Sequence, residues 1–153
     1  MTTIIQLFIA MQFLLLIIMA LHDWIHIPPL TNIRELEKYH SRNQRFLTSF
    51  IYTIIVLIPL TLTLYYQPYF SWFTLINIAL FYGFLTFGVI SSWWVPYFFG
   101  SSEKLKNSFV VYKNTHHFLP PRGTNIVPNT FHVLLHLLVL ICFCFALFLM
   151  MIK

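Results

Sequence analysis

The sequence predicts an all-α protein, a four-helix bundle integral to a membrane, from three observations. The 153-residue chain is 59% hydrophobic and 8% charged, whereas soluble domains carry about 25% charged residues. Apolar stretches at about residues 3–25, 46–66, 72–95 and 130–151 each approach the ~20 residues that a helix needs to cross a bilayer. All but one of the Lys and Arg residues lie in two segments between these stretches. We therefore expect a single four-helix domain over residues 1–153.

The first stretch gives way to a short second helix. Pro28 and Pro29 disfavour continued helix, because proline lacks an amide donor and restricts the residue before it. Thr31 or Asn32 can then cap a new helix, with Glu35 three residues after Asn32 as in a capping box. Apolar side chains recur there at helical spacing, with most charges elsewhere. We expect this helix to lie flat in the membrane interface.

The two middle stretches are joined by the uncharged link 67–71, and a longer segment leads to the last helix. That segment, about residues 100–129, holds Leu119-Pro120-Pro121-Arg122-Gly123. Its aromatic and apolar content argues against disorder. Pro128, followed by Asn129 or Thr130, is a helix start signal. The fourth helix is expected to begin there.

Positive charge predicts the orientation. The basic residues between the stretches are Arg34, Lys38, Arg42, Arg45, Lys104, Lys106, Lys113 and Arg122. The positive-inside rule makes both segments cytoplasmic, so both termini face outward. Every histidine then falls on the cytoplasmic side of what we expect to be a bacterial cytoplasmic membrane. Because the charge of +5 is explained by topology and lipid head groups, no nucleic-acid partner is expected.

The histidines suggest a metal site. His22/His26 and His132/His136 are i,i+4 pairs, which put two imidazoles on one helix face. If the first and last helices are neighbours, as in a closed bundle, the four rings converge. His116 and His117 can close the site from the loop. Imidazole ligands suit transition metals, iron or zinc first among them here.

Charged residues complete the predicted site. Asp23 or Glu35 would serve as a carboxylate ligand, or as an acceptor for an imidazole N–H. Arg122, beside His116 and His117 in the sequence, would orient an anionic lipid head group through its planar fork.

The pattern resembles the histidine boxes of the membrane fatty-acid desaturase and hydroxylase superfamily, whose HxxxH and HxxHH motifs face the cytoplasm and bind two irons. The resemblance covers only His22/His26, His116/His117 and His132/His136. Because the sequence contains no HxxHH, the likeness concerns the chemistry of the site and not family membership.

Three functions follow. The first is a metal-dependent hydrolase or oxidoreductase acting on a lipid or other membrane-dissolved substrate. The second is a haem- or metal-binding or transport protein. The third is a non-catalytic partner, such as an immunity or assembly subunit, that binds another membrane protein or a second copy of itself. Cys142 and Cys144 are two residues apart and point to nearly opposite helix faces, so a thiol redox enzyme is disfavoured.

Overall fold

The computed structural model describes residues 2–153 and is all-helical, with no strand in that range. Four helical spans are long and apolar enough to cross a membrane. They are α1 (Thr2–Leu21), α3 (Arg42–Tyr66), the run Trp72–Phe99 that begins with α4 (Trp72–Val89), and α7 (Thr130–Met151). The predicted all-α architecture, with four helices long and apolar enough to span a membrane, is confirmed.

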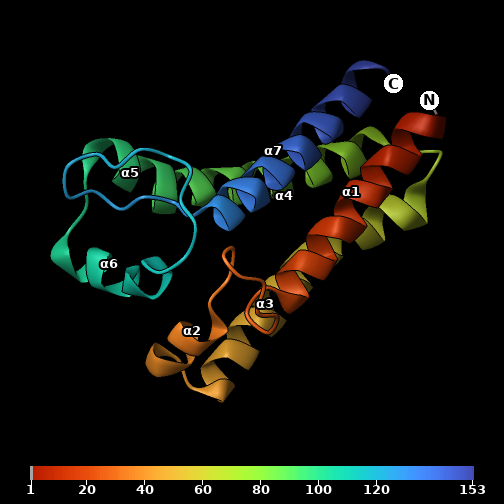
Figure 1. Ribbon diagram of the computed structural model, residues 1–153. Coiled ribbons are helices and arrows are strands. Elements are labelled where there is room, and N and C mark those ends of the chain that lie inside the picture. Colours follow the sequence, from red (N-terminus) through yellow and green to blue (C-terminus); the bar gives the residue numbers. More distant parts are fainter. Residues whose placement is uncertain (1) are drawn as a thin grey trace.

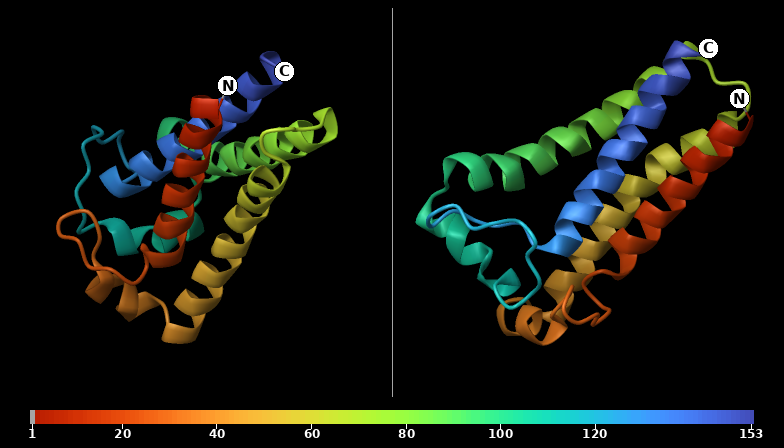
Figure 2. Two further views of the ribbon diagram at one scale, coloured as in Figure 1. Left: turned by 90° about the vertical axis from the view of Figure 1, so that its right-hand side faces the viewer. Right: turned by 45° about the horizontal axis from the view of Figure 1, so that its top comes forward.

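The helices pack in the order α3, α1, α7, α4. Helix α1 contacts both α3 and α7, and α7 contacts α4 (Figure 1). The first and last helices are therefore neighbours, as predicted. The start of α1, the end of α7 and the α3–α4 turn lie at one end of the bundle, whereas residues 22–41 and 100–129 gather at the other, called here the basic end (Figure 1). Toward the basic end α3 and α4 diverge (Figure 2).

Helix α1 ends at Leu21, earlier than the predicted residue 25. The His22 ring supplies one cause, because its Nδ1 lies 3.1 Å from the Ile18 carbonyl oxygen and 3.2 Å from that of Met19. An imidazole N–H there can satisfy the Met19 carbonyl near the helix end, whereas the Ile18 carbonyl also accepts from the His22 amide at 2.9 Å. The following loop is held by Thr31, whose hydroxyl donates to the Ile25 carbonyl at 2.7 Å. His26 therefore does not continue the helical face of His22.

Side-chain caps start the next helices. Asn32 caps α2 (Ile33–Tyr39) by accepting from the Glu35 amide, so the predicted short helix exists. A capping box between Ser41 and Gln44 starts α3 at residue 42 instead of the predicted 46. Asn129 caps α7, at the predicted start.

The third span changes helix type near its end. After Val89 the backbone forms a π-helix, η1 (Ile90–Trp94), and then α5 (Val95–Phe99). It stops at Gly100, whose φ of 90° favours glycine. The connection to α7 contains α6 (Glu103–Ser108) and the 3-10 turn η2 (Val110–Tyr112). Single π-helical turns inside α-helices occur often at functional sites.

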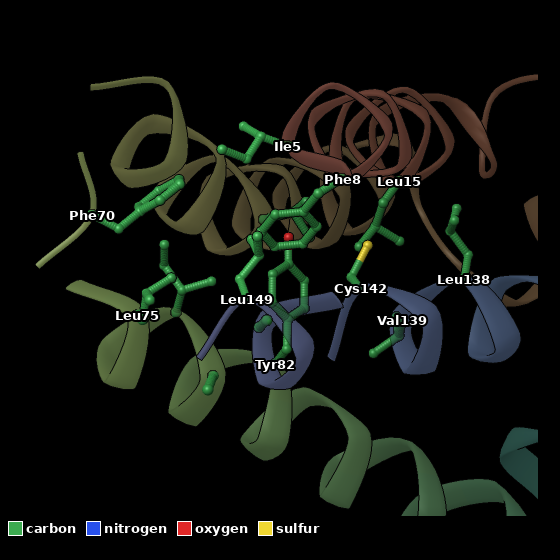
Figure 3. Packing of buried hydrophobic residues seen from close by; sticks show 14 of the residues in the cluster. Ile5, Phe8, Leu15, Phe70, Leu75, Tyr82, Leu138, Val139, Cys142 and Leu149 are labelled. Carbon is green, nitrogen blue, oxygen red and sulfur yellow. The ribbon is translucent and has the colours of Figure 1, made fainter. Parts of the chain in front are cut away.

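The apolar core lies toward the end with the termini. Phe8 of α1, Tyr82 of α4 and Cys142 of α7 are fully buried there (Figure 3). Cys142 is buried and Cys144 is exposed, and within residues 2–153 both are free thiols. Their opposite faces agree with the prediction from the sequence.

Candidate functional site

A cavity of about 460 Å³ lies at the basic end, where α3 and α4 diverge. Its lining residues Tyr52 on α3 and Phe84 on α4 are exposed, whereas Leu135, His136 and Val139 on α7 are buried. The cavity therefore opens between α3 and α4 and has α7 as its floor. Polar and apolar side chains both line it, so it can receive a ligand of mixed character.

His22 and Asp23 form a close pair in the cavity wall. The His22 Nε2 lies 3.3 Å from the Asp23 Oδ1, and both side chains are largely buried. Because His22 Nδ1 faces two carbonyl oxygens, that nitrogen carries a hydrogen. The lone pair of a neutral ring would then face the carboxylate. A proton or a metal ion between Nε2 and Oδ1 removes that repulsion.

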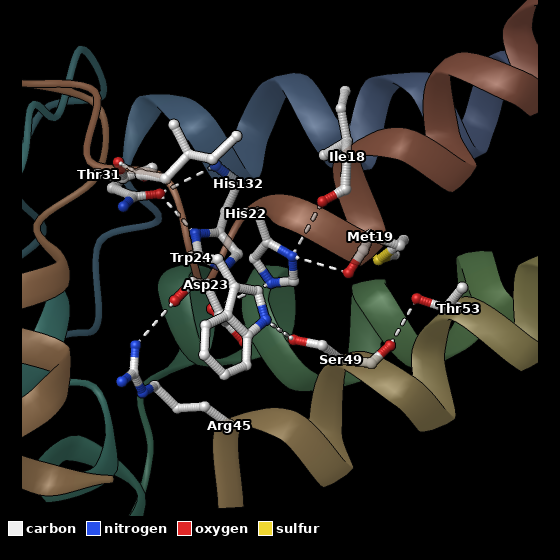
Figure 4. A network of polar contacts seen from close by, with 12 residues as sticks. Ile18, Met19, His22, Asp23, Trp24, Thr31, Arg45, Ser49, Thr53 and His132 are labelled. Carbon is white, nitrogen blue, oxygen red and sulfur yellow. Dashed lines mark hydrogen bonds and ion pairs between the residues drawn. The ribbon is translucent and has the colours of Figure 1, made fainter. Parts of the chain in front are cut away.

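His132 is held in place by Asn129. The Asn129 Oδ1 accepts from the His132 amide at 2.9 Å and lies 2.7 Å from the His132 Nδ1. Asn129 Nδ2 donates to the Thr115 hydroxyl at 2.9 Å, which fixes the amide orientation and places a hydrogen on His132 Nδ1. The Nε2 of His132 is left as the nitrogen able to bind a ligand. Its ring centre lies 6.4 Å from that of His22 (Figure 4).

Aromatic rings enclose His132. Trp93, within the π-helix, stacks on it with ring centres 4.2 Å apart and planes at 27°. Tyr112 approaches from another side at 4.6 Å. Burial, and next the nearby Asp23 carboxylate, raise the pKa of the Tyr112 hydroxyl. His136, one turn along α7, has an Nδ1 that is buried without a hydrogen-bond partner among residues 2–153.

A second polar group borders the cavity. The Arg45 guanidinium donates to the Asp23 carbonyl oxygen at 3.2 Å and to Glu37 at 2.9 Å. Its centre also lies 4.8 Å from the centre of the Trp24 ring, and Trp24 donates to Ser49 (Figure 4). Arg45 thereby ties α3 to the loop after α1.

Some of the predicted site residues meet in this cavity. His22, Asp23, His132 and His136 line it. The other predicted residues, His26, Glu35, His116, His117 and Arg122, do not line it.

Several of these outer residues have partners of their own. His116 Nδ1 lies 2.7 Å from the Thr130 hydroxyl, and His117 Nε2 lies 3.0 Å from the Tyr112 carbonyl oxygen. Glu35 pairs with Lys38 at 2.7 Å. The Arg122 guanidinium lies over the Phe98 ring at 4.9 Å. Their predicted metal, carboxylate and head-group roles stay predictions.

Sequence reasoning missed part of the site. Trp93 is not among the residues predicted for the site, and Arg45 was given only a topological role. Nothing in the local sequence shows that a π-helix turns Trp93 onto His132. For Asn129 a signal existed, since a cap three residues before a histidine can reach both its amide and its ring.

Among residues 2–153, no three His, Cys, Asp or Glu side chains stand together in a group that could hold a metal ion. No protein-family model, curated protein or solved structure matches the chain. Its function must therefore be inferred from its own residues.

Proposed function

We propose that the chain is a membrane enzyme that takes an amphiphile from the bilayer into the cavity between α3 and α4. His22, Asp23 and His132 would carry the chemistry, with a transition metal, iron or zinc, completing the site. The observation that carries the proposal is that this histidine–carboxylate group lies in the wall of a cavity with polar and apolar parts, which opens between two helices apolar enough to span a membrane.

The lining of the cavity supports an amphiphile. One part is polar, with His22, Asp23, His40 and Arg45. Another part is apolar and includes Met19, Phe84, Leu85, Leu135 and Val139. A molecule with a polar head and an apolar body matches both parts. A lateral opening between helices would let such a molecule enter without leaving the membrane.

Topology supports a cytoplasmic location for the cavity. The basic end carries all Lys and Arg residues except Lys153, and such residues favour the cytoplasmic side. Both termini would then face outward, and α2 would lie at the inner membrane surface. Reporter fusions at the C-terminus test this orientation: an outward location requires activity of a reporter that works only outside the cytoplasm.

The orientation of the His22 and His132 imidazoles supports the proposed metal. Histidine ligands of metals generally donate the other ring N–H to an oxygen, which fixes the ring. His22 and His132 both do so through Nδ1. Tetrahedral ligands at about 2.0–2.1 Å from a metal lie about 3.4 Å apart, close to the 3.3 Å between His22 Nε2 and Asp23 Oδ1.

For His132 to become the third ligand beside His22 and Asp23, its ring must move slightly toward that of His22. Two imidazoles on one tetrahedral metal have ring centres about 5 Å apart, and those of His22 and His132 are 6.4 Å apart. Metal binding must therefore draw the ring centres together by about 1.4 Å. A metal with an open position could then activate water or dioxygen.

Elemental analysis and an absorption spectrum of the detergent-purified chain test the metal. We expect bound metal that is lost in His22→Ala, Asp23→Asn and His132→Ala and kept in the matched controls His26→Ala and His116→Ala, which alter histidines outside the cavity. Equal loss in His26→Ala would instead favour the i,i+4 pair predicted from the sequence. A Soret band in the spectrum would indicate that the bound group is haem.

A metal-free chain that takes up no added iron or zinc would refute the metal site. If amphiphile binding also proved absent, stable co-purification with a membrane partner, unaffected by the histidine substitutions, would favour a non-catalytic subunit.

A further inference from the structure

Arg45 is an unusual residue for the wall of this cavity. It is 7% exposed, and arginine is seldom buried unless its donors are paired. Its Nη1 donates to the Asp23 carbonyl oxygen and its Nη2 to Glu37 (Figure 4). Its Nε–H is buried and has no hydrogen-bond partner in the described part of the chain. Arg45 lines the cavity, so a small movement of its guanidinium would offer this unpaired donor to a ligand.

The geometry of a guanidinium indicates what that donor fits. The Nε–H and the adjacent Nη2–H form one edge of the fork, and such an edge binds two oxygens of a carboxylate or phosphate in parallel. Glu37 occupies only Nη2, with one oxygen at 2.9 Å. Its side chain is 52% exposed, and ion pairs open to solvent are weak. An incoming oxyanion can take Nε–H and compete with Glu37 for Nη2–H.

The charges around the cavity favour the same ligand. Among the lining residues within 2–153, Arg45 is the only Lys or Arg, and Asp23 is the only Asp or Glu. The Asp23 carboxylate already faces His22 Nε2, and Arg45 contacts the Asp23 backbone carbonyl, not its carboxylate. His40, the cap residue at the end of α2, lines the cavity too. The cationic group available to a ligand is therefore the Arg45 guanidinium.

We propose that Arg45 binds an oxyanion, a phosphate or a carboxylate, at the polar end of the amphiphile, and that Glu37 competes with it. This inference rests on the proposed amphiphile cavity and names its substrate class as anionic. The oxyanion binds Arg45 in the polar part of the cavity, and the apolar body lies against Leu135 and Val139. Glu37 holds the guanidinium in position while no ligand is bound.

The test measures equilibrium binding of defined amphiphiles to the detergent-purified full chain. The probes are oleic acid and dioleoyl phosphatidic acid, with oleyl alcohol and dioleoylglycerol as partners that lack the anion, and inorganic phosphate alone. The variants are Arg45→Gln, Arg45→Lys and Glu37→Gln, with Arg42→Gln as the matched control, because Arg42 is exposed and does not line the cavity.

Arg45→Gln should weaken binding of the anionic amphiphiles by about 10- to 100-fold, the worth of charge-assisted hydrogen bonds, with little effect on the neutral partners. Arg45→Lys should recover only part of that affinity, and Glu37→Gln should bind the anionic probes more tightly than the unaltered chain. Arg42→Gln should change neither. Tighter binding of phosphatidic acid than of oleic acid would identify phosphate as the anion, and tighter binding of oleic acid would identify a carboxylate. Tight binding of inorganic phosphate alone would refute the proposal that the ligand is an amphiphile.

A variant at Gly88 separates this inference from the proposed function. Gly88 lines the cavity, and an added Cβ would meet no atom within 4 Å in the described part of the chain. Gly88→Trp should therefore fill the cavity and abolish binding of charged and neutral amphiphiles alike. If it changes nothing, the amphiphile cavity itself is refuted. If it abolishes binding while Arg45→Gln and Glu37→Gln leave the anionic preference unchanged, only the role of Arg45 is refuted. Should Arg45→Gln fail to fold, the opposite effects expected for Arg45→Lys and Glu37→Gln decide the matter.

Discussion

Replacing Asn129 by alanine should remove two contacts together: the cap at the start of α7 and the hydrogen bond that holds the His132 ring. Asn129 is 2% exposed, and its Oδ1 serves both the first turn of α7 and the His132 ring. Losing a helix cap costs about 0.5–2 kcal/mol, and a buried imidazole N–H left unpaired costs about 1–3 kcal/mol. The two overlap in part, so we expect a loss of about 2–4 kcal/mol in the free energy of unfolding.

The chain contains a natural reporter for this measurement. Cys142 is 0% exposed in the core, so a thiol-reactive dye labels it only on unfolding. In a Cys144→Ala background, which removes the exposed thiol, labelling against denaturant concentration gives the stability of each variant. Asn129→Asp keeps the acceptor but loses the donor to Thr115 and buries a carboxylate, so it should recover only part of the stability. A loss below about 0.5 kcal/mol in Asn129→Ala would refute the assigned double role, since even an exposed cap is worth that much.

Three further substitutions test other contacts with the same assay. Trp93→Ala should lower the free energy of unfolding by about 2 kcal/mol, because it removes the half-buried ring stacked 4.2 Å from His132. Trp93→Phe should restore part of that loss. Equal stability of the two variants would contradict a stabilising role of the stacked ring. Gln12→Leu should change stability by less than about 1 kcal/mol in either direction. Thr63 keeps its hydrogen bond to the Pro59 carbonyl, and the substitution removes a buried Gln12 Oε1 that has no partner within residues 2–153. A large loss of stability would show that this oxygen has a partner. Tyr112→Phe should flatten the loss of stability above pH 10. The raised pKa of Tyr112 keeps the folded state protonated there while the unfolded state releases its proton, so stability falls as pH rises through that range. An unchanged alkaline limb would show that Tyr112 ionises normally.

The fold could be predicted from the sequence because the membrane imposes simple rules. Long apolar runs must be helical in lipid, which gave the four spans, and Asn129 marked the start of α7. The ends were harder to predict. The capping box of Ser41 and Gln44 starts α3 inside a polar segment, and the His22 ring helps to end α1. Both depend on where side chains lie and not on hydrophobicity.

The site could be predicted only in part for the same reason. Helical spacing brought His132 and His136 to one face, and both line the cavity. The matching pair at His22 and His26 assumed that α1 continues to residue 25, and the loop after Leu21 separates the two. Trp93 was missed because a π-helical turn changes which side chains share a face. Spacing rules hold only while the backbone keeps 3.6 residues per turn.

The early end of α1 and the π-helix in the third span have a common consequence. Both interrupt an α-helix at the basic end, and both bring a side chain, His22 in one case and Trp93 in the other, next to His132. At the opposite end the spans stay α-helical, with Pro59 inside α3, and pack through Phe8, Tyr82 and Cys142. Apolar packing there contributes stability that can offset a cavity and unpaired polar atoms at the basic end. Departures from α-helical geometry cluster at functional sites in proteins, so their position beside the cavity supports the proposed binding role.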